Sequence, residues 1–297
     1  MSLGIRALLV VLVLVLAWFL WQWVSTERGR RDFTPTWVDV AIGFVTNFFD
    51  ALGIGNFAPT TAAFKLLKRM PDEEIPGTLN AGHSPPVVVE GLIFIAAVSI
   101  DLSTLLGMLV AAVVGAWFGA GIVARLPRGA VQIGMGVALL IAAVLFLAAN
   151  LHWMPGGGTA RGLSGAALVF AVCVNFVLGA LMTLGIGLYA PCLILVSLLG
   201  MSPLAAFPIM MGSCALLMPV AGIRFIKARR YNLRASLGLA LGGIPAVLIA
   251  AYIVRSLPLV WLRWLVVLVV TYAGLTMLSS ALRSYRVRRR GITAATG

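Results

Sequence analysis

The amino-acid sequence predicts an all-α polytopic membrane protein in which two inverted repeats follow one extra N-terminal helix. Three observations lead to this prediction: an apolar composition, apolar stretches long enough to cross a bilayer, and a heptapeptide that recurs at a fixed distance. Of the 297 residues, 61% are hydrophobic and 10% are charged, whereas soluble domains are about 45–50% apolar and about 25% charged. A soluble fold cannot hide that much apolar surface, so lipid must cover part of it. The composition therefore excludes a soluble enzyme and a disordered or fibrous chain.

The positive charges lie in short connections between the apolar stretches. The chain has 22 Lys and Arg against 9 Asp and Glu, a formal net charge of +13. Clusters of this kind are what the positive-inside rule expects of cytoplasmic loops, so we expect no nucleic-acid partner. The clusters lie at 28–31, 65–69, 125–128, 224–234 and 283–290.

Seven apolar stretches have the length of a membrane span. The first ends in Trp18, Trp21 and Trp23 and lacks an A-x-A cleavage site, so we expect a retained helix with an aromatic belt, not a signal peptide. Two longer stretches, 37–67 and 162–199, are interrupted in the middle by Gly and Pro. The seven spans are 3–24, 76–100, 102–124, 130–149, 203–226, 233–254 and 258–282.

A repeated heptapeptide divides the chain into two halves. Residues 53–59 read GIGNFAP and residues 185–191 read GIGLYAP, with five of seven positions identical and an offset of 132. The same offset pairs Pro71 with Pro203, and one offset held over more than a hundred residues indicates a duplication. The expected domains are an extra transmembrane helix at 1–27, a first repeat at 36–151, a second repeat at 162–284 and a basic cytoplasmic tail at 285–297.

Loop charges distinguish two ways in which the interrupted stretches can sit in the membrane. If both cross it, the chain has about nine spans, and its Lys and Arg divide into 14 inside and 8 outside. If each enters and returns as a re-entrant hairpin, about seven full spans remain and the division is 18 to 4, which obeys the positive-inside rule better. Each repeat then holds one hairpin and three spanning helices, and the odd number of crossings inverts the second repeat. The N-terminus would lie outside and the C-terminus in the cytoplasm.

Helices broken at equivalent positions of inverted repeats predict a central transport site. Short helices that begin near Pro59 and Pro191 would aim their N-termini, each with about half a positive charge, at one cavity. Because the second half has no carboxylate, we expect a small anion there. The alternative is that the glycines serve helix packing. The expected substrate-binding residues are Gly53, Gly55, Asn56, Pro59, Thr60, Asn80, His83, Ser84, Gly185, Gly187, Tyr189, Pro191 and Ser213.

Ionisable residues at membrane depth are candidates for proton coupling, because a charge there is costly. These candidates are His83, Glu90 and Asp50; alternatively, His83 makes an interhelical hydrogen bond or pairs with Glu90. Two prolines after His83 predict a helix break, and Pro219 predicts a corresponding break in the second repeat. Asp101 precedes Leu-Ser-Thr and is expected to be a helix N-cap.

At its repeated glycine motif the chain resembles the sulfite exporter TauE/SafE family of bacterial membrane proteins. The resemblance covers about 37–284 and rests on a duplicated G-x-G-x-x-x-P element, eight or nine hydrophobic segments and short basic loops. It implies transport of sulfite, sulfonates such as sulfoacetate, or thiosulfate across the cytoplasmic membrane. Related thiosulfate carriers are said to use cysteines; Cys192 and Cys214 follow the second motif, and the alternative is that they are apolar core residues.

Together these features predict a secondary transporter, an exporter of a small sulfur-containing anion, in the bacterial cytoplasmic (inner) membrane. The alternative is a membrane-embedded scaffold or assembly subunit without transport activity. An enzyme is not expected, because neither histidine lies in an H-E-x-x-H motif and no G-x-S-x-G or Walker sequence is present. The expected partners are the anion and the lipid bilayer, with homo-oligomer formation left open. No cofactor and no metal are expected.

Overall fold

The computed structural model describes residues 2–30, 33–153, 158–185 and 187–253, with isolated positions between 264 and 282. This part of the chain is all-helical, as predicted, with eleven α-helices and the 3-10 helix η1 (Asp72–Glu74). The α-helices are α1 (Leu3–Glu27), α2 (Trp37–Asp50), α3 (Phe57–Leu66), α4 (Ile75–Gly82), α5 (Ser84–Ala97), α6 (Leu102–Val123), α7 (Arg128–Asn150), α8 (Gly165–Met182), α9 (Tyr189–Leu198), α10 (Pro203–Lys227) and α11 (Leu233–Ile253).

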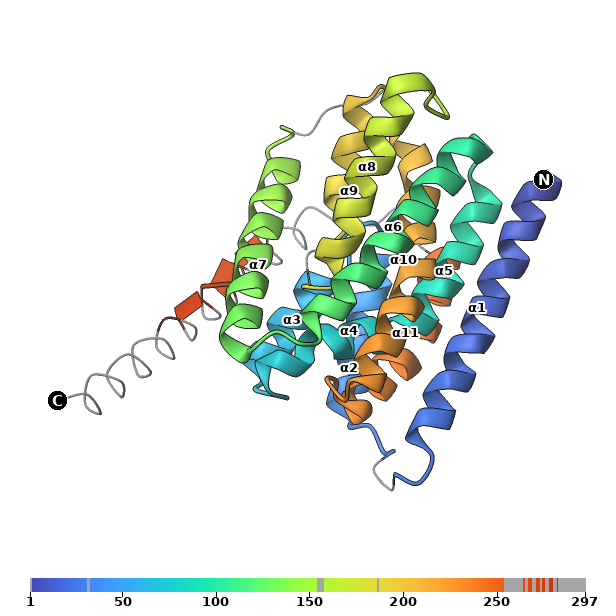
Figure 1. Ribbon diagram of the computed structural model, residues 1–297. Helices are drawn as coiled ribbons and strands as arrows, with labels where there is room; N and C mark the ends of the chain where they lie inside the picture. Colours follow the sequence, from blue (N-terminus) through green and yellow to red (C-terminus); the bar gives the residue numbers. More distant parts are fainter. Residues whose placement is uncertain are drawn as a thin grey trace.

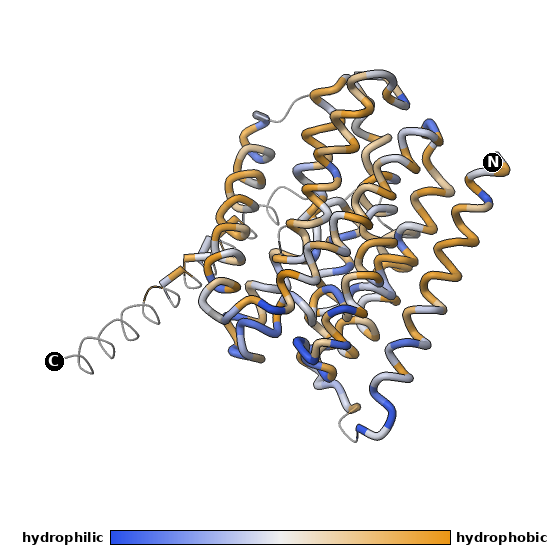
Figure 2. The backbone as a smooth tube through the Cα atoms, viewed as in Figure 1, coloured by the Kyte–Doolittle hydropathy of each residue, from blue (hydrophilic) through white to orange (hydrophobic). Residues whose placement is uncertain are grey.

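Five of these helices are long and apolar enough to cross a bilayer, so the protein is a multi-pass membrane protein. They are α1, α6, α8, α10 and α11. Figure 1 shows α1 along one side of the bundle and α7 along the other. Apolar residues cover the helices, and hydrophilic residues gather at the lower end in Figure 2. Most of the expected span 258–282 and all of the expected tail 285–297 lie outside the described residues.

The N-terminal helix α1 is anchored to the bundle at its C-terminal end. Glu27 is 1% exposed and forms ion pairs with Arg229 (2.6 Å) and Arg30 (3.1 Å). Trp23 Nε1 donates a hydrogen bond to the Tyr231 hydroxyl at 3.1 Å. These contacts hold α1 against the turn between α10 and α11.

Helix boundaries recur at the offset found in the sequence. The helices α2 and α8 end at Asp50 and Met182, and α3 and α9 begin at Phe57 and Tyr189; both pairs are 132 residues apart. In both copies a turn of glycines separates the two helices, and Gly53 and Gly185 adopt φ of 83° and 97°. Such angles favour glycine because it has no Cβ. The repeated glycines therefore produce the same helix–turn–helix unit twice, and we call α2–α3 the first broken unit and α8–α9 the second.

Each broken unit returns to the end of the bundle where it began. In the first unit, Arg69, three residues beyond the end of α3, forms an ion pair at 2.9 Å with Asp39 in the first turn of α2. In the second, the segment before α8 pairs with the residues after α9, where Ser202 N donates to Ala160 O at 2.8 Å and Gly158 N donates to Met201 O at 2.9 Å. The two ends of each unit are therefore neighbours.

The two broken units open at opposite ends of the molecule. The 25-residue helix α10 begins directly after Ser202, beside the opening of the second unit, and leads to α11. The first turns of α11 pack on the first turn of α2, because Gly238 lies against Asp39 at the opening of the first unit. A helix of this length covers about 37 Å, so the openings are separated by the length of a membrane span.

The chain is broken after the first unit but not after the second. His83 ends α4 and α5 begins at Ser84, followed by Pro85 and Pro86, as the sequence predicted. The predicted break in the second repeat is wrong, because α10 runs continuously through Pro208 and Pro219. A single proline removes only one backbone N–H, and neighbouring helices can satisfy the carbonyl that it frees. Two consecutive prolines remove two N–H groups and therefore disrupt the helix more strongly.

Asp101 is the N-cap of α6, as predicted. Its carboxylate accepts hydrogen bonds from Thr104 N (2.9 Å) and the Ser103 hydroxyl (2.6 Å). These bonds hold the pKa of Asp101 below its usual value, since they stabilise the charged form.

We therefore expect Asp101→Ala to destabilise the protein by about 1 kcal/mol, the typical effect of losing an N-cap. Asp101→Asn should keep most of the stability, because asparagine caps as well as aspartate. The folded-state pKa is lowered, so the charge-dependent part is present at neutral pH and lost as the pH falls below about 4. Thermal unfolding in detergent at several pH values measures both effects. Equal stability of Asp101→Ala and the wild type at neutral pH would contradict the cap assignment.

Candidate functional site

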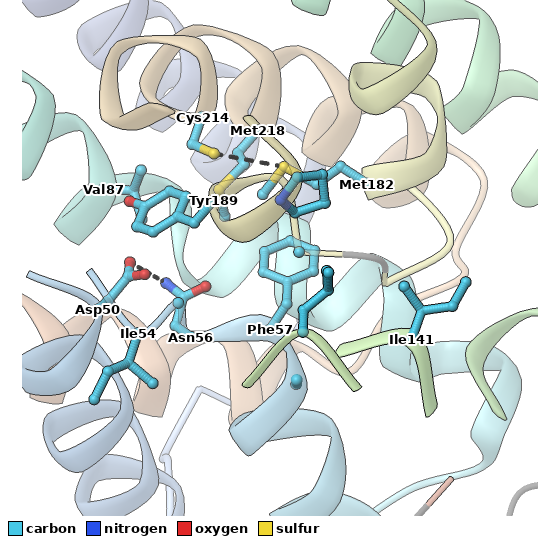
Figure 3. A pocket seen from close by; sticks show the side chains of 15 residues that line it. Asp50, Ile54, Asn56, Phe57, Val87, Ile141, Met182, Tyr189, Cys214 and Met218 are labelled. Carbon is cyan, nitrogen blue, oxygen red and sulfur yellow. Dashed lines mark hydrogen bonds between the residues drawn. The ribbon is translucent and has the colours of Figure 1, made fainter. Parts of the chain in front are cut away.

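A cavity of about 40 Å³ lies where the two broken units meet (Figure 3). One water needs about 10–15 Å³ by this measure, so the cavity has room for a few waters or a small ion. Its walls come from both units and from α5, α7 and α10. The lining residues are Asp50, Ile54, Gly55, Asn56, Phe57, Ala58, Val87, Ile141, Leu145, Met182, Gly187, Tyr189, Pro191, Cys214 and Met218.

The N-termini of α3 and α9 both contribute to this lining. The N-cap positions Asn56 and Leu188 make no side-chain capping bond, so the first N–H groups of each helix are left without an acceptor from the helix itself. Pro59 and Pro191 occupy the third helical position, where a missing N–H removes no helix bond. Two positive helix ends at one cavity form an arrangement that suits an anion.

Two buried carboxyl groups adjoin the cavity. Asp50 and Glu90 are 1% and 0% exposed, and their side chains lie within hydrogen-bonding reach of each other. Tyr189 donates to Glu90 Oε2 at 3.0 Å, and Asn56 Nδ2 donates to Asp50 Oδ2 at 2.7 Å (Figure 3). Glu90 Oε1 has no other donor in the described part of the chain. Two carboxyl groups can bond each other only when one holds a proton, so the pair is a place for a shared proton.

A chain of polar side chains continues from this pair into the core. Asn47 Oδ1 accepts from Asn56 Nδ2 (3.1 Å) and from His83 Nδ1 (3.1 Å). Because this oxygen can only accept, His83 carries a proton on Nδ1. Its Nε2 lies 3.0 Å from the Thr60 hydroxyl. The structure therefore places His83 in an interhelical hydrogen-bond network, and Glu90 bonds Tyr189 instead of His83.

The structure brings six of the expected residues into the cavity lining. The hydrogen bonds just described connect four expected residues with the cavity lining: Asp50 bonds Asn56, Glu90 bonds Tyr189, and His83 bonds Asn47 and Thr60. Pro59 lies in the first turn of α3, and the tips Gly53 and Gly185 pack near Phe207 and Met135. The six lining residues are Asp50, Gly55, Asn56, Gly187, Tyr189 and Pro191.

Three further expected residues use their polar atoms away from the cavity. Asn80 Nδ2 donates to Pro76 O (2.8 Å), and the Ser84 hydroxyl donates to Asn80 O (2.6 Å). Ser213 accepts from Asn175 Nδ2 at 3.2 Å. None of the three is among the residues that line the cavity.

Apolar and sulfur-containing side chains complete the cavity, and most of them were not expected. Met182, Cys214 and Met218 form one wall, with Cys214 Sγ 3.6 Å from Met182 Sδ. Ile141 and Leu145 come from α7. Ile54, Phe57 and Ala58 belong to the repeated heptapeptide, and Met182 is the last residue of α8, equivalent to Asp50 across the offset of 132.

The charge of this site restricts what it can bind. Among the residues that line the cavity none is basic, and the described ion pairs leave Asp50 and Glu90 without a cation. Ionised carboxylates would repel an anion at the helix N-termini. Protonation of the carboxyl pair lowers this repulsion, so an anion is favoured at the site when the pair is protonated. The described residues contain no group of three His, Cys, Asp or Glu that could hold a metal ion.

Comparison with known proteins identifies one family. The family model of the sulfite exporter TauE/SafE matches residues 2–146. The match includes α1, which the sequence resemblance treated as an addition, and it ends within α7. No curated protein and no solved structure shows a significant match.

Proposed function

We propose that the chain is a secondary transporter that exports sulfite or an organosulfonate such as sulfoacetate, because residues 2–146 match the family model of the sulfite exporter TauE/SafE, whose members are transporters and not enzymes. The observation that carries this proposal is the convergence of the α3 and α9 N-termini on one cavity. Helix ends can bind a sulfonate or sulfite group through backbone N–H groups without a basic side chain.

The two broken units act as re-entrant hairpins of inverted repeats. Three observations support this: the neighbouring ends of each unit, the openings at opposite ends of α10, and the recurrence of helix boundaries. In this arrangement 36–151 and 162–284 are the repeats, 1–27 is the extra helix and 285–297 is the tail. Movement of one repeat against the other exposes the cavity alternately to the two sides.

The basic end of the bundle faces the cytoplasm in this proposal. The turn after α1, the turn after α3 and the α10–α11 turn carry Arg28, Lys68, Arg69, Arg229 and Arg230. The opposite end carries Arg161. The positive-inside rule then places the N-terminus outside the bacterial inner membrane and the C-terminus inside.

Transport is coupled to protons through the carboxyl pair. Asp50 and Glu90 share a proton that enters with the anion, and His83 extends the hydrogen-bonded chain from Asn47 to Thr60. The substrate-binding set is Gly55, Asn56, Gly187, Tyr189 and Pro191, with Gly53, Gly185, Pro59 and Thr60 shaping the two helix starts.

Flux into proteoliposomes tests the function. We expect saturable uptake of radiolabelled sulfite and sulfoacetate by the purified full chain, inhibited by an excess of the unlabelled anion. Taurine, which carries an additional positive charge, serves as the comparison substrate. Correctly folded protein that moves none of these anions would contradict the proposal and favour a scaffold subunit.

A further inference from the structure

A groove of about 390 Å³ lies on the bundle surface between α1, α6 and α10, and it shares no lining residue with the cavity. Three basic residues line it, Arg125, Arg224 and Lys227, together with Trp18 and Trp117. None of the described residues that line it is acidic. The groove therefore concentrates positive charge beside aromatic surface.

Arg224 is held in this groove without a carboxylate partner among the described ion pairs. Its guanidinium lies 4.3 Å from the ring centroid of Trp117, and Nη1 donates to Trp117 O at 2.7 Å. Gly121 leaves room for it, since a Cβ there would lie 2.6 Å from Arg224 Nη2. Glu27, a carboxylate of this end, is already paired with Arg229 and Arg30. The charge of Arg224 is therefore available to a bound anion.

The lining is ordered by depth. Arg224 and Lys227 lie in the last turn of α10, and Arg125 follows the C-cap of α6. Trp117 lies more than one turn before the end of α6, and Trp18 lies more than two turns before the end of α1. The cations thus face the water side and the indole rings the hydrocarbon side, which is the order of a phospholipid's headgroup and chains.

We propose that this groove binds an anionic phospholipid, with the phosphate on Arg224, Lys227 and Arg125 and the acyl chains against Trp18. Basic pockets between helices at the cytoplasmic surface suit such headgroups. Charge complementarity favours an anionic over a zwitterionic lipid. The groove is open, and its two tryptophans, Trp18 and Trp117, are 38% and 48% exposed. This apolar aromatic surface favours a lipid over a free phosphate ion, which would remain largely hydrated there.

Native mass spectrometry of the purified full chain, titrated with phosphatidylglycerol or phosphatidylcholine, tests the proposal. We expect preferential binding of phosphatidylglycerol that weakens about 25-fold in the double variant Arg224→Gln/Lys227→Gln, because each basic residue near an anionic lipid contributes about a fivefold effect. The charge-matched control is Arg28→Gln/Lys68→Gln, two exposed residues of the same end outside the groove. The control should bind as the wild type does.

Three results would overturn the proposal. The first is equal binding of the two lipids by the wild type. The second is equal weakening in the control, which would indicate unspecific surface charge. The third is displacement of the lipid by glycerol phosphate at similar concentration, which would indicate a soluble anion. Thermal unfolding of each variant shows that it is folded, and Trp117→Leu provides a second variant that keeps every charge and should still weaken binding.

Discussion

Gly187→Leu should reduce anion flux to the background of protein-free liposomes while the protein remains folded. A Cβ at Gly187 meets no atom within 4 Å, and this glycine, unlike Gly55 (φ 88°), does not adopt a left-handed backbone conformation. The leucine side chain therefore enters the open space beside Pro191 without backbone strain. Since the cavity measures only about 40 Å³, that side chain fills it.

Gly129→Leu is the matched control for this substitution. A Cβ at Gly129 also meets nothing within 4 Å, and the residue lies in the first turn of α7, outside the cavity lining. Its flux should equal that of the wild type. Gly187→Ala should give intermediate flux, because one methyl group leaves part of the space. Wild-type flux through Gly187→Leu would exclude this cavity from the transport route.

Glu90→Gln should uncouple transport from the proton gradient. In the wild type, acidification of the side from which the anion enters should accelerate uptake, because protonation lowers the negative charge of the Asp50–Glu90 pair before the anion binds. The glutamine amide in this variant cannot hold that proton, yet its oxygen still accepts the hydrogen bond from Tyr189. We therefore expect anion exchange at equal pH to persist while the effect of the gradient disappears.

Sulfoacetate is the substrate for this experiment, because its sulfonate stays ionised over the pH range used and sulfite does not. Asp50→Asn should behave as Glu90→Gln does, since the two carboxyl groups share one proton. Asp101→Asn, which changes a carboxylate at the start of α6, should keep the gradient effect. Persistent acceleration in both Glu90→Gln and Asp50→Asn would show that the carboxyl pair does not carry the coupling.

The sequence could predict the broken helices because their causes are local. Glycines with positive φ and a proline within the first helical turn end one helix and begin the next, and both copies have them. The helices α3 and α9 accordingly begin two residues before Pro59 and Pro191. The break at His83 was predictable for the same reason, from two adjacent prolines.

The remaining features depend on tertiary contacts that no local pattern encodes. Asn80 and Ser84 are polar at membrane depth, but the side chain of each donates a hydrogen bond to the backbone carbonyl four residues earlier. The polarity of a residue does not show whether its side chain binds a substrate or forms such a local bond. The wall formed by Met182, Cys214 and Met218 arises because the C-terminal end of α8 meets α10, where Cys214 Sγ lies 3.6 Å from Met182 Sδ. Glu90 reaches Tyr189 across 99 positions of the chain, and no motif spans that distance.

Labelling of Cys214 tests the central claim, that the anion binds in the cavity between α3 and α9, most directly. The protein would carry Cys214 alone, with Cys173→Ala and Cys192→Ala, and react with a membrane-impermeant sulfonate-bearing thiol reagent. We expect slow labelling that sulfoacetate inhibits at the concentrations that saturate transport, because the Cys214 thiol lines the cavity. Labelling at a rate that sulfoacetate leaves unchanged would contradict the claim.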